Sequence, residues 1–130
     1  MRRYTASFTA AAGDIDELGH VNNAVWVAWV QEVAVSHWRA VAPADIDAAY
    51  LWVISRHEID YRGNIGLGET ALAETWVADA PRGARFDRHV RFTDAGGRVL
   101  VEALTSWAML DRSRGRLVRV PASMVALFAG

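Results

Sequence analysis

The chain has 130 residues, no cysteine and a formal net charge of −1, and 52% of its residues are hydrophobic. These values predict a single globular domain, residues 1–130, and exclude disulfides, thiolate metal sites and a cysteine nucleophile. A net charge near zero gives no support to bulk attraction to nucleic acid, and no apolar run is long enough to span a bilayer. We therefore expect a cytoplasmic protein that binds neither nucleic acid nor membranes.

The first third of the chain predicts one strand, a loop and one long helix. Residues 4–10 alternate weakly between apolar and polar positions, as a strand does, and glycines mark residues 11–21 as a loop. A helix follows, with Asn22 or Asn23 as its N-cap, and runs to about Val41 because a proline stands two residues later. The seven residues after the asparagines carry no polar side chain, so we expect protein to surround this helix.

The rest of the chain predicts strands that turn back on one another. Residues 84–93 have the clearest period of two, with Phe86, Val90 and Phe92 on one face. One helix followed by a series of antiparallel strands favours an α+β fold, in which a curved sheet wraps around a central helix. Such a sheet has open edges, so we also expect a homodimer or a dimer of dimers. The predicted strands cover residues 51–61, 69–80, 84–93, 98–111 and 116–120, and Pro121 opens a final helical turn.

Charge is distributed unevenly along the chain. Residues 1–80 hold five arginines and eleven acidic residues, whereas residues 81–130 hold nine arginines and four acidic residues. Guanidinium groups match phosphate oxygens well, so the second part is a candidate phosphate-binding face. The same pattern also fits a sheet with one solvated, charged side.

Polar residues gather just before the long helix, in the sequence DIDELGHVNN of residues 14–23. An EF-hand calcium loop needs a carboxylate at its twelfth position, where Val25 stands. A zinc site could draw on Asp14, Asp16 and His20, but neither an HExxH pattern nor a cysteine pair accompanies them. A serine-hydrolase elbow and a glycine-rich phosphate loop are also missing. We therefore expect no metal and no cofactor.

A carboxylate beside a helix N-terminus can carry out acyl transfer. The first turn of a helix has free N–H groups and a partial positive charge, which stabilise the oxyanion formed at a carbonyl. An aspartate nearby can attack that carbonyl or activate a water molecule that does. The alternative is that Asp14, Asp16, Asn22 and Asn23 serve only as turn and cap residues.

The sequence DIDELGHVNNAVWVAWVQEVA, residues 14–34, resembles the signature of the hotdog-fold acyl thioesterases. These are the 4-hydroxybenzoyl-CoA thioesterase-like proteins, and plant acyl-ACP thioesterases share the D-x-D-x-x-G-H-V-N-N core. Residues 53–77 and 119–128 resemble later parts of the family more loosely. The resemblance implies a helix inside a sheet, dimers with active sites at the subunit interface, and hydrolysis of a thioester of coenzyme A or acyl carrier protein without a cofactor.

By this resemblance Asp16 is the catalytic nucleophile or general base, and the helix amide near Asn23 polarises the thioester carbonyl. His20 takes a catalytic or positioning role, and Asn22 contacts the substrate. Leu18 stands where the plant relatives have an asparagine, so their complete mechanism does not transfer. Family members hold the phosphates of coenzyme A with basic residues near the turn before the fourth strand, which implies that Arg82, Arg85 and Arg88 bind them here.

Two other functions remain open at this point. An aspartate and a histidine close together also suit the addition of water to an enoyl-CoA, as in a hotdog hydratase or dehydratase. The chain could also bind acyl-CoA without turning it over, although binding alone does not need the Asp16 carboxylate.

Overall fold

The computed structural model describes residues 1–130. It contains the strand, the long helix and the later strands in the predicted order. The one regular helix that the sequence did not predict is α2, which begins directly after the proline that ends the long helix. The elements are β1 (Tyr4–Thr9), the 3₁₀ turn η1 (Ala12–Asp14), α1 (Asn23–Val41), α2 (Ala44–Ala49), β2 (Tyr50–Tyr61), β3 (Thr70–Val77), β4 (Arg85–Thr93), β5 (Val99–Asp111), β6 (Arg116–Leu117) and α3 (Ala122–Leu127).

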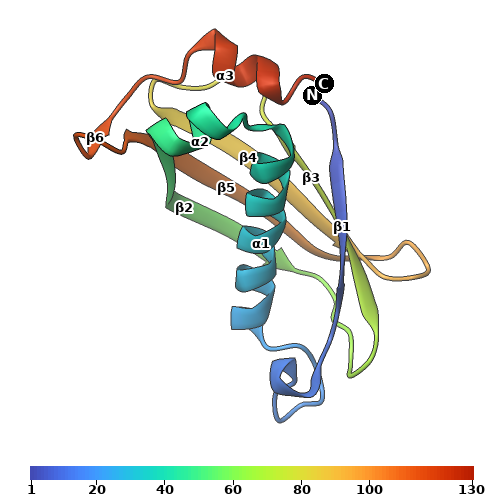
Figure 1. The fold of residues 1–130 in the computed structure, drawn as a ribbon. Coiled ribbons are helices and arrows are strands. Elements are labelled where there is room, and N and C mark those ends of the chain that lie inside the picture. The colour runs from blue at the N-terminus through green and yellow to red at the C-terminus, as the bar shows by residue number, and fades with distance from the viewer.

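The strands form one antiparallel sheet with the order β1-β3-β4-β5-β2, and β6 adds a short pairing to the end of β5. The sheet curves around α1, which lies across its inner face (Figure 1). The short helices α2 and α3 lie near the C-terminal end of α1, together with both chain termini (Figure 1). This arrangement confirms the predicted α+β architecture of a curved sheet around one central helix.

One face of α1 is not covered by its own chain. The helix begins after Asn22, whose side-chain Oδ1 accepts a hydrogen bond from the Ala24 N–H at 2.8 Å. Ala24, Ala28 and Val35 are exposed on the face that points away from the sheet, so this chain covers only part of the helix that we expect protein to surround. The same exposed side of the helix carries Gln31 and Glu32 as well. The face that packs on the sheet buries Trp26, Trp29, Val30, Val33, Ala34, His37 and Trp38.

The sequence before β2 folds into α2 although it has no helical hydrophobic period. Pro43 supplies the N-cap, and the first turn carries Asp45 and Asp47, which interact favourably with the positive end of a helix. Asp47 also accepts a hydrogen bond from the indole Nε1 of Trp38 at 2.8 Å. Arg112 adds bonds from its Nε to the Asp47 carbonyl and from its N–H to the Ala49 carbonyl. Tertiary contacts thus stabilise a helix too short to be stable alone.

The hydrophobic core consists of two clusters, one at each end of α1. The larger cluster surrounds Trp26 and Trp29 near the start of the helix, and the smaller one surrounds Trp38 and Phe128 near its end. The aromatic rings in both clusters pack edge to face or at a tilt, as buried aromatic rings prefer. Each cluster therefore has its own aromatic centre.

A row of polar side chains separates the two clusters on the inner face of the sheet. Arg88 on β4 lies opposite Thr105 on β5, which in turn lies opposite His57 on β2. The His57 Nδ1 and the Thr105 hydroxyl are 2.9 Å apart. His37 of α1 and Thr75 of β3 contact Arg88 from the other side, at 2.9 and 3.0 Å from its Nη1. We call these five residues the polar row.

His37 must be neutral to take its place in the polar row. Arginine has no acceptor atom, so Nη1 of Arg88 donates and Nδ1 of His37 accepts. Burial, and then the charge of Arg88, lower the pKa of His37 to about 4. The imidazole is stacked on the Tyr4 ring, with ring centroids 5.0 Å apart.

We expect the free energy of unfolding to fall as the pH drops from about 6.5 towards about 4. In this range the unfolded chain binds a proton at its histidine with a pKa near 6.5, while folded His37 does not. The loss reaches at most roughly 3 kcal/mol, since one pKa unit corresponds to about 1.4 kcal/mol. Urea unfolding at a series of pH values measures it. His37→Gln should flatten the dependence and exposed His20→Gln should not; equal slopes for His37→Gln and the wild type would contradict this assignment.

Candidate active site

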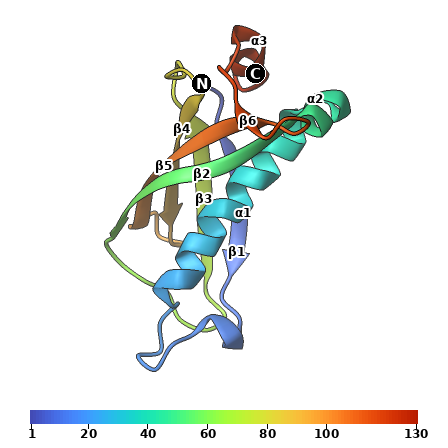
Figure 2. The same ribbon diagram turned by 90° about the vertical axis from the view of Figure 1, so that its left-hand side faces the viewer.

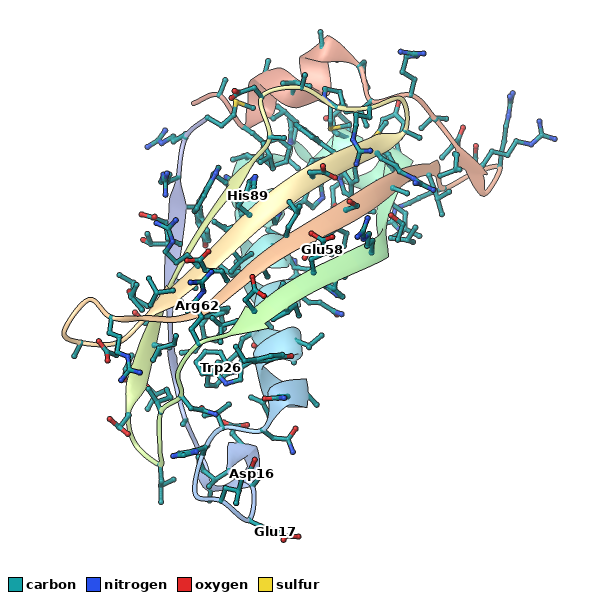
Figure 3. The ribbon with its side chains drawn as sticks, turned by 180° about the vertical axis from the view of Figure 1, so that it is seen from behind. Asp16, Glu17, Trp26, Glu58, Arg62 and His89 are labelled. Atoms are coloured by element: carbon teal, nitrogen blue, oxygen red, sulfur yellow. The ribbon has the colours of Figure 1, made fainter.

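The loop that carries the DIDELGHVNN sequence closes on itself at the N-terminal end of α1 (Figure 3). Ile15 and Val21 form an isolated antiparallel bridge across it. Inside the bridge, the Asp16 N–H donates to the His20 carbonyl at 2.9 Å, and the Gly19 N–H donates to the Asp16 carbonyl at 3.0 Å. Gly19 has a φ of +78°, which a side chain would disfavour. The glycine of the motif therefore closes the turn that presents Asp16.

The two oxygens of the Asp16 carboxylate have different surroundings. Oδ1 accepts hydrogen bonds from the backbone N–H groups of Leu18 at 2.9 Å and His20 at 3.4 Å. Oδ2 receives no hydrogen bond from the protein, and the side chain is half-buried. The turn thus fixes the orientation of the carboxylate through one oxygen and leaves the other available to a substrate or a water molecule.

The first turn of α1 leaves one N–H group without an acceptor. The carbonyl of Asn22 accepts from the N–H groups of Val25 and Trp26, and its side chain accepts from Ala24. The N–H of Asn23 donates to no protein atom. Because helix N-termini carry a partial positive charge, this free donor is suited to bind a negatively charged oxygen.

Asp14 and Asn22 shape the loop. The Asp14 Oδ2 accepts from the Ala11 N–H at 2.9 Å, and the Asp14 carbonyl accepts from the Asn22 N–H at 2.9 Å. Asn22 is the N-cap of α1. The side chain of His20 is exposed beside them. The structure thus brings Asp16, His20, Asn22 and Asn23 together at one end of the helix.

Sequence analysis missed Asn64, which joins this loop to the end of β2. Its Nδ2 donates to the Val21 carbonyl at 3.0 Å, and its Oδ1 accepts from the Trp26 Nε1 at 3.3 Å and from the Ile65 N–H at 2.9 Å. The Val21 N–H donates in turn to the Ile65 carbonyl at 3.1 Å. The only signal was an asparagine within the glycine-rich turn RGNIG, which is typical of a side chain that bonds to backbone.

Arg82 and Arg85 lie at the turn between β3 and β4, at the opposite end of the sheet from Asp16 (Figures 1 and 3). Their backbones bond to each other, and both side chains are exposed. Arg82 Nη2 donates to both carboxylate oxygens of Asp87, at 3.0 and 3.1 Å. Burial opposes ionisation of Asp87, but hydrogen bonds from Ser106 and Arg82 outweigh it and hold its pKa below the usual value. Arg85 has no ion-pair partner.

Arg88 does not join these two arginines. The alternation of β4 places it on the inner face, where it is only 5% exposed and belongs to the polar row. Burial lowers its pKa to about 10, so the guanidinium is still charged at neutral pH. Its role on phosphates of coenzyme A was predicted together with Arg82 and Arg85, yet the structure separates it from their surface.

A cavity of about 250 Å³ lies between the C-terminal half of α1, α2, α3 and the sheet. It is far from the Asp16 loop of the same chain. Val35 and Leu51 at its mouth are exposed, and Arg88 forms part of its wall. The other residues that line it are Ala34, Trp38, Arg39, Asp47, Tyr50, Trp52, Val77, Phe86, Trp107, Arg112 and Phe128.

No group of three or more histidine, aspartate or glutamate side chains is placed to hold a metal ion. No helix is long and apolar enough to cross a membrane.

We expect Asn64→Ala to lower the free energy of unfolding by about 1–3 kcal/mol, because it leaves buried partners without hydrogen bonds. Asn64→Asp keeps the Oδ1 acceptor but places a carboxylate oxygen against the Val21 carbonyl, so it should be destabilised as well. Thermal unfolding of the three proteins should show the wild type to be more stable than both variants. Equal stabilities would show that Asn64 does not anchor the loop.

The chain matches the model of the thioesterase-like superfamily over residues 10–128. None of the curated proteins matches it. Several solved structures share its fold. A 1,4-dihydroxy-2-naphthoyl-CoA thioesterase from Synechocystis is 15% identical with a TM-score of 0.83, over 98% of this chain and 96% of that one.

Two further structures have the same fold. A thioesterase from Thermus thermophilus, solved with coenzyme A and zinc, is 21% identical with a TM-score of 0.84, over 97% of each chain. The 12:0-ACP thioesterase from Umbellularia californica is 14% identical with a TM-score of 0.82, over 98% of this chain and 49% of that one. The hotdog fold expected from the sequence is thus confirmed, and so is thioester hydrolysis as the class of activity. The chain belongs to the thioesterase-like superfamily.

Proposed function

We propose that the protein hydrolyses acyl-CoA thioesters at the Asp16 loop. The observation that carries this proposal is the free N–H of Asn23 at the start of α1, next to a carboxylate that has one oxygen fixed and one free. This pairing supplies an oxyanion donor and a base or nucleophile, which are the two groups that acyl transfer requires. Family membership supports thioesters as the substrates.

In the proposed reaction the thioester carbonyl oxygen binds at the Asn23 N–H. Oδ2 of Asp16 attacks the carbonyl carbon, or removes a proton from a water molecule that attacks it. Negative charge develops on the carbonyl oxygen, where the helix N-terminus stabilises it. The C–S bond then breaks, and the leaving thiolate takes up a proton. If a water molecule attacked, the free acid forms at once; if Asp16 attacked, a water molecule hydrolyses the resulting acyl-Asp16 anhydride, so both routes give the free acid and the thiol. Exposed His20 is placed to position the water or to give a proton to the leaving thiolate, and Asn22 contacts the substrate.

Coenzyme A is the favoured carrier of the acyl group. Arg85 has no ion-pair partner and lies beside Arg82 at the β3–β4 turn, so its guanidinium is available to phosphate oxygens. Arg82 uses Nη2 on Asp87 and has its other N–H groups left for a phosphate. Two of the solved structures with this fold contain coenzyme A. An acyl carrier protein would present the same thioester, and it remains the alternative partner.

A second copy of the chain is proposed to complete the site. β2 is a 12-residue strand at the edge of the sheet, with its outer edge unpaired (Figure 2). Long open edges favour pairing with another strand, and apolar side chains on β2 and the neighbouring face of α1 remain exposed. These are Leu51, Val53 and Tyr61 on β2 and Ala24, Ala28 and Val35 on α1.

Antiparallel pairing of two β2 strands would bring the two halves of a site together. The end of β2 is tied to the start of α1, because the Tyr61 hydroxyl donates to the Asn23 carbonyl at 3.5 Å. The start of β2 lines the cavity with Tyr50 and Leu51. In a two-fold pair the start of one β2 lies beside the end of the other, so the cavity of one copy faces the Asp16 loop of its partner. The acyl group then lies in the cavity and the thioester at the partner's loop.

We expect Asp16→Asn to lower kcat on acyl-CoA substrates by roughly 10²- to 10⁴-fold, the usual contribution of a general base. The amide still accepts the hydrogen bonds of Leu18 and His20, so the loop keeps its shape. Release of free thiol over a panel of aromatic, short and long acyl-CoAs measures the rate. Asp14→Asn, which keeps its loop contact, should change kcat only slightly. Unchanged turnover in Asp16→Asn would exclude Asp16 as the catalytic carboxylate.

We expect Ala28→Glu to convert a dimer to a monomer and to abolish activity. Ala28 is exposed on the uncovered face of α1, so the change leaves the fold of one chain intact while placing a charge in the proposed contact. Sedimentation velocity measures the mass. Leu72→Glu is the control, because Leu72 is 45% exposed on β3, away from β2. A dimer that persists with Ala28→Glu would contradict this interface.

A further inference from the structure

The cavity beside α1 combines aromatic walls with a buried positive charge. Six of its lining side chains carry aromatic rings, and Trp38, Trp52 and Phe86 pack against one another within it. Rings of this kind bind flat or chain-like apolar groups. The volume of about 250 Å³ is just below the roughly 300–1,000 Å³ of typical ligand sites, so a small acyl group is expected. An apolar acyl group alone, however, would not need the arginine.

Arg88 has no counter-ion in the protein. It forms no salt bridge with any carboxylate, although it is only 5% exposed. Its two hydrogen bonds both leave from Nη1, to His37 and Thr75, and both acceptors are neutral. The ring of Phe128 lies 5.6 Å from its Cζ and stabilises the charge only partly. A buried charge without a partner is costly, so an anion is the expected occupant of the neighbouring space.

Other groups that line the cavity favour an anion as well. Arg39 and Arg112 lie at the wall, and Asp47 is the only acidic residue among the lining side chains. The charged residues around the cavity are therefore three arginines and one aspartate. The Asp47 carboxylate is occupied by the Trp38 Nε1, which donates to it at 2.8 Å.

We propose that the cavity binds an acyl group that ends in a carboxylate, and that Arg88 binds this carboxylate. The substrate is then the coenzyme A monothioester of a small dicarboxylic acid, a ω-carboxyacyl-CoA. This inference rests on the proposed function, since it names the substrate class of that site. The thioester lies at the Asp16 loop of the partner copy, and the carboxylate lies at the polar row. Arg88 acts as a specificity residue because it contacts the end of the substrate that does not react.

Two matched pairs of substrates test the assignment. Adipoyl-CoA and hexanoyl-CoA have acyl chains of the same length, and 4-carboxybenzoyl-CoA and 4-methylbenzoyl-CoA differ in the same way on a ring. The wild type should hydrolyse the carboxylate member of at least one pair with a kcat/KM at least tenfold higher, mainly through KM. Arg88→Met should remove this preference, and Arg88→Lys should restore part of it. The fold should survive, because a buried charge can often be replaced by an apolar side chain of similar size.

Arg85→Met is the matched control, because it removes an exposed arginine of the same strand. It should lower kcat/KM equally for both members of each pair and leave the ratio of the two values unchanged. No preference for the carboxylate in either pair, or a preference that Arg88→Met retains, would overturn the assignment. The circular dichroism spectrum and melting temperature of each variant confirm that it is folded.

A binding measurement separates this inference from the proposed hydrolysis. The cavity is lined by Trp38, Trp52 and Trp107, so ligand binding should quench tryptophan fluorescence. Titration of Asp16→Asn with each pair should give at least tenfold tighter binding of one carboxylate member, and the double variant Asp16→Asn/Arg88→Met should lose the difference. Selective binding without hydrolysis by the wild type would refute the catalytic proposal and support the carboxylate site. Hydrolysis by the wild type without selective binding of the carboxylate member would support the catalytic proposal and refute the carboxylate site.

Discussion

The structure depends on how the sheet holds the N-terminal end of α1. A helix terminus is useful for chemistry only if its free N–H group has a fixed position, and three contacts provide this. Asn64 bonds to the backbone just before the helix and to Trp26 in its first turns, Tyr61 bonds to the carbonyl of Asn23, and Asn22 caps the helix. The large aromatic cluster beneath this end makes the contacts rigid, because the ring of Trp26 is fully buried. The position of the helix terminus and the packing of the core are therefore coupled at this end of the molecule.

The opposite end of α1 packs on a core that is not continuous. There the core is interrupted by the polar row, and the space beyond it is a cavity. A sheet interior normally excludes charge, so Arg88 can remain only because His37 and Thr75 accept its hydrogen bonds. The neutral state of His37 is a consequence of the same contact. The half-buried carboxylate of Asp16 thus lies near one end of α1 and the buried guanidinium of Arg88 near the other. In the proposed two-fold pair both groups would contact the same substrate.

Sequence reasoning recovered the features whose cause is local. The N-cap at Asn22, the end of α1 before Pro43 and the alternation of β4 follow from neighbouring residues, and the structure has all three. The parts that it missed depend on tertiary contacts. α2 has no hydrophobic period and depends on Asp47 meeting Trp38, while the bonds of Asn64 join segments about 40 residues apart. Arg88 was grouped with Arg82 and Arg85 because the family resemblance implies phosphate-binding basic residues near this turn, whereas cross-strand register places Arg88 in the polar row.

The division of the core has a consequence for how this kind of enzyme can diversify. The polar row separates the side chains that hold the Asp16 loop from those that line the cavity, so a change of shape in one cluster need not be compensated in the other. Substitutions at Trp52, Phe86 or Phe128 can alter the size and shape of the cavity while the loop and its helix terminus keep their positions. The fold therefore allows the cavity at one end of the helix to change by drift while the structure at the other end stays the same.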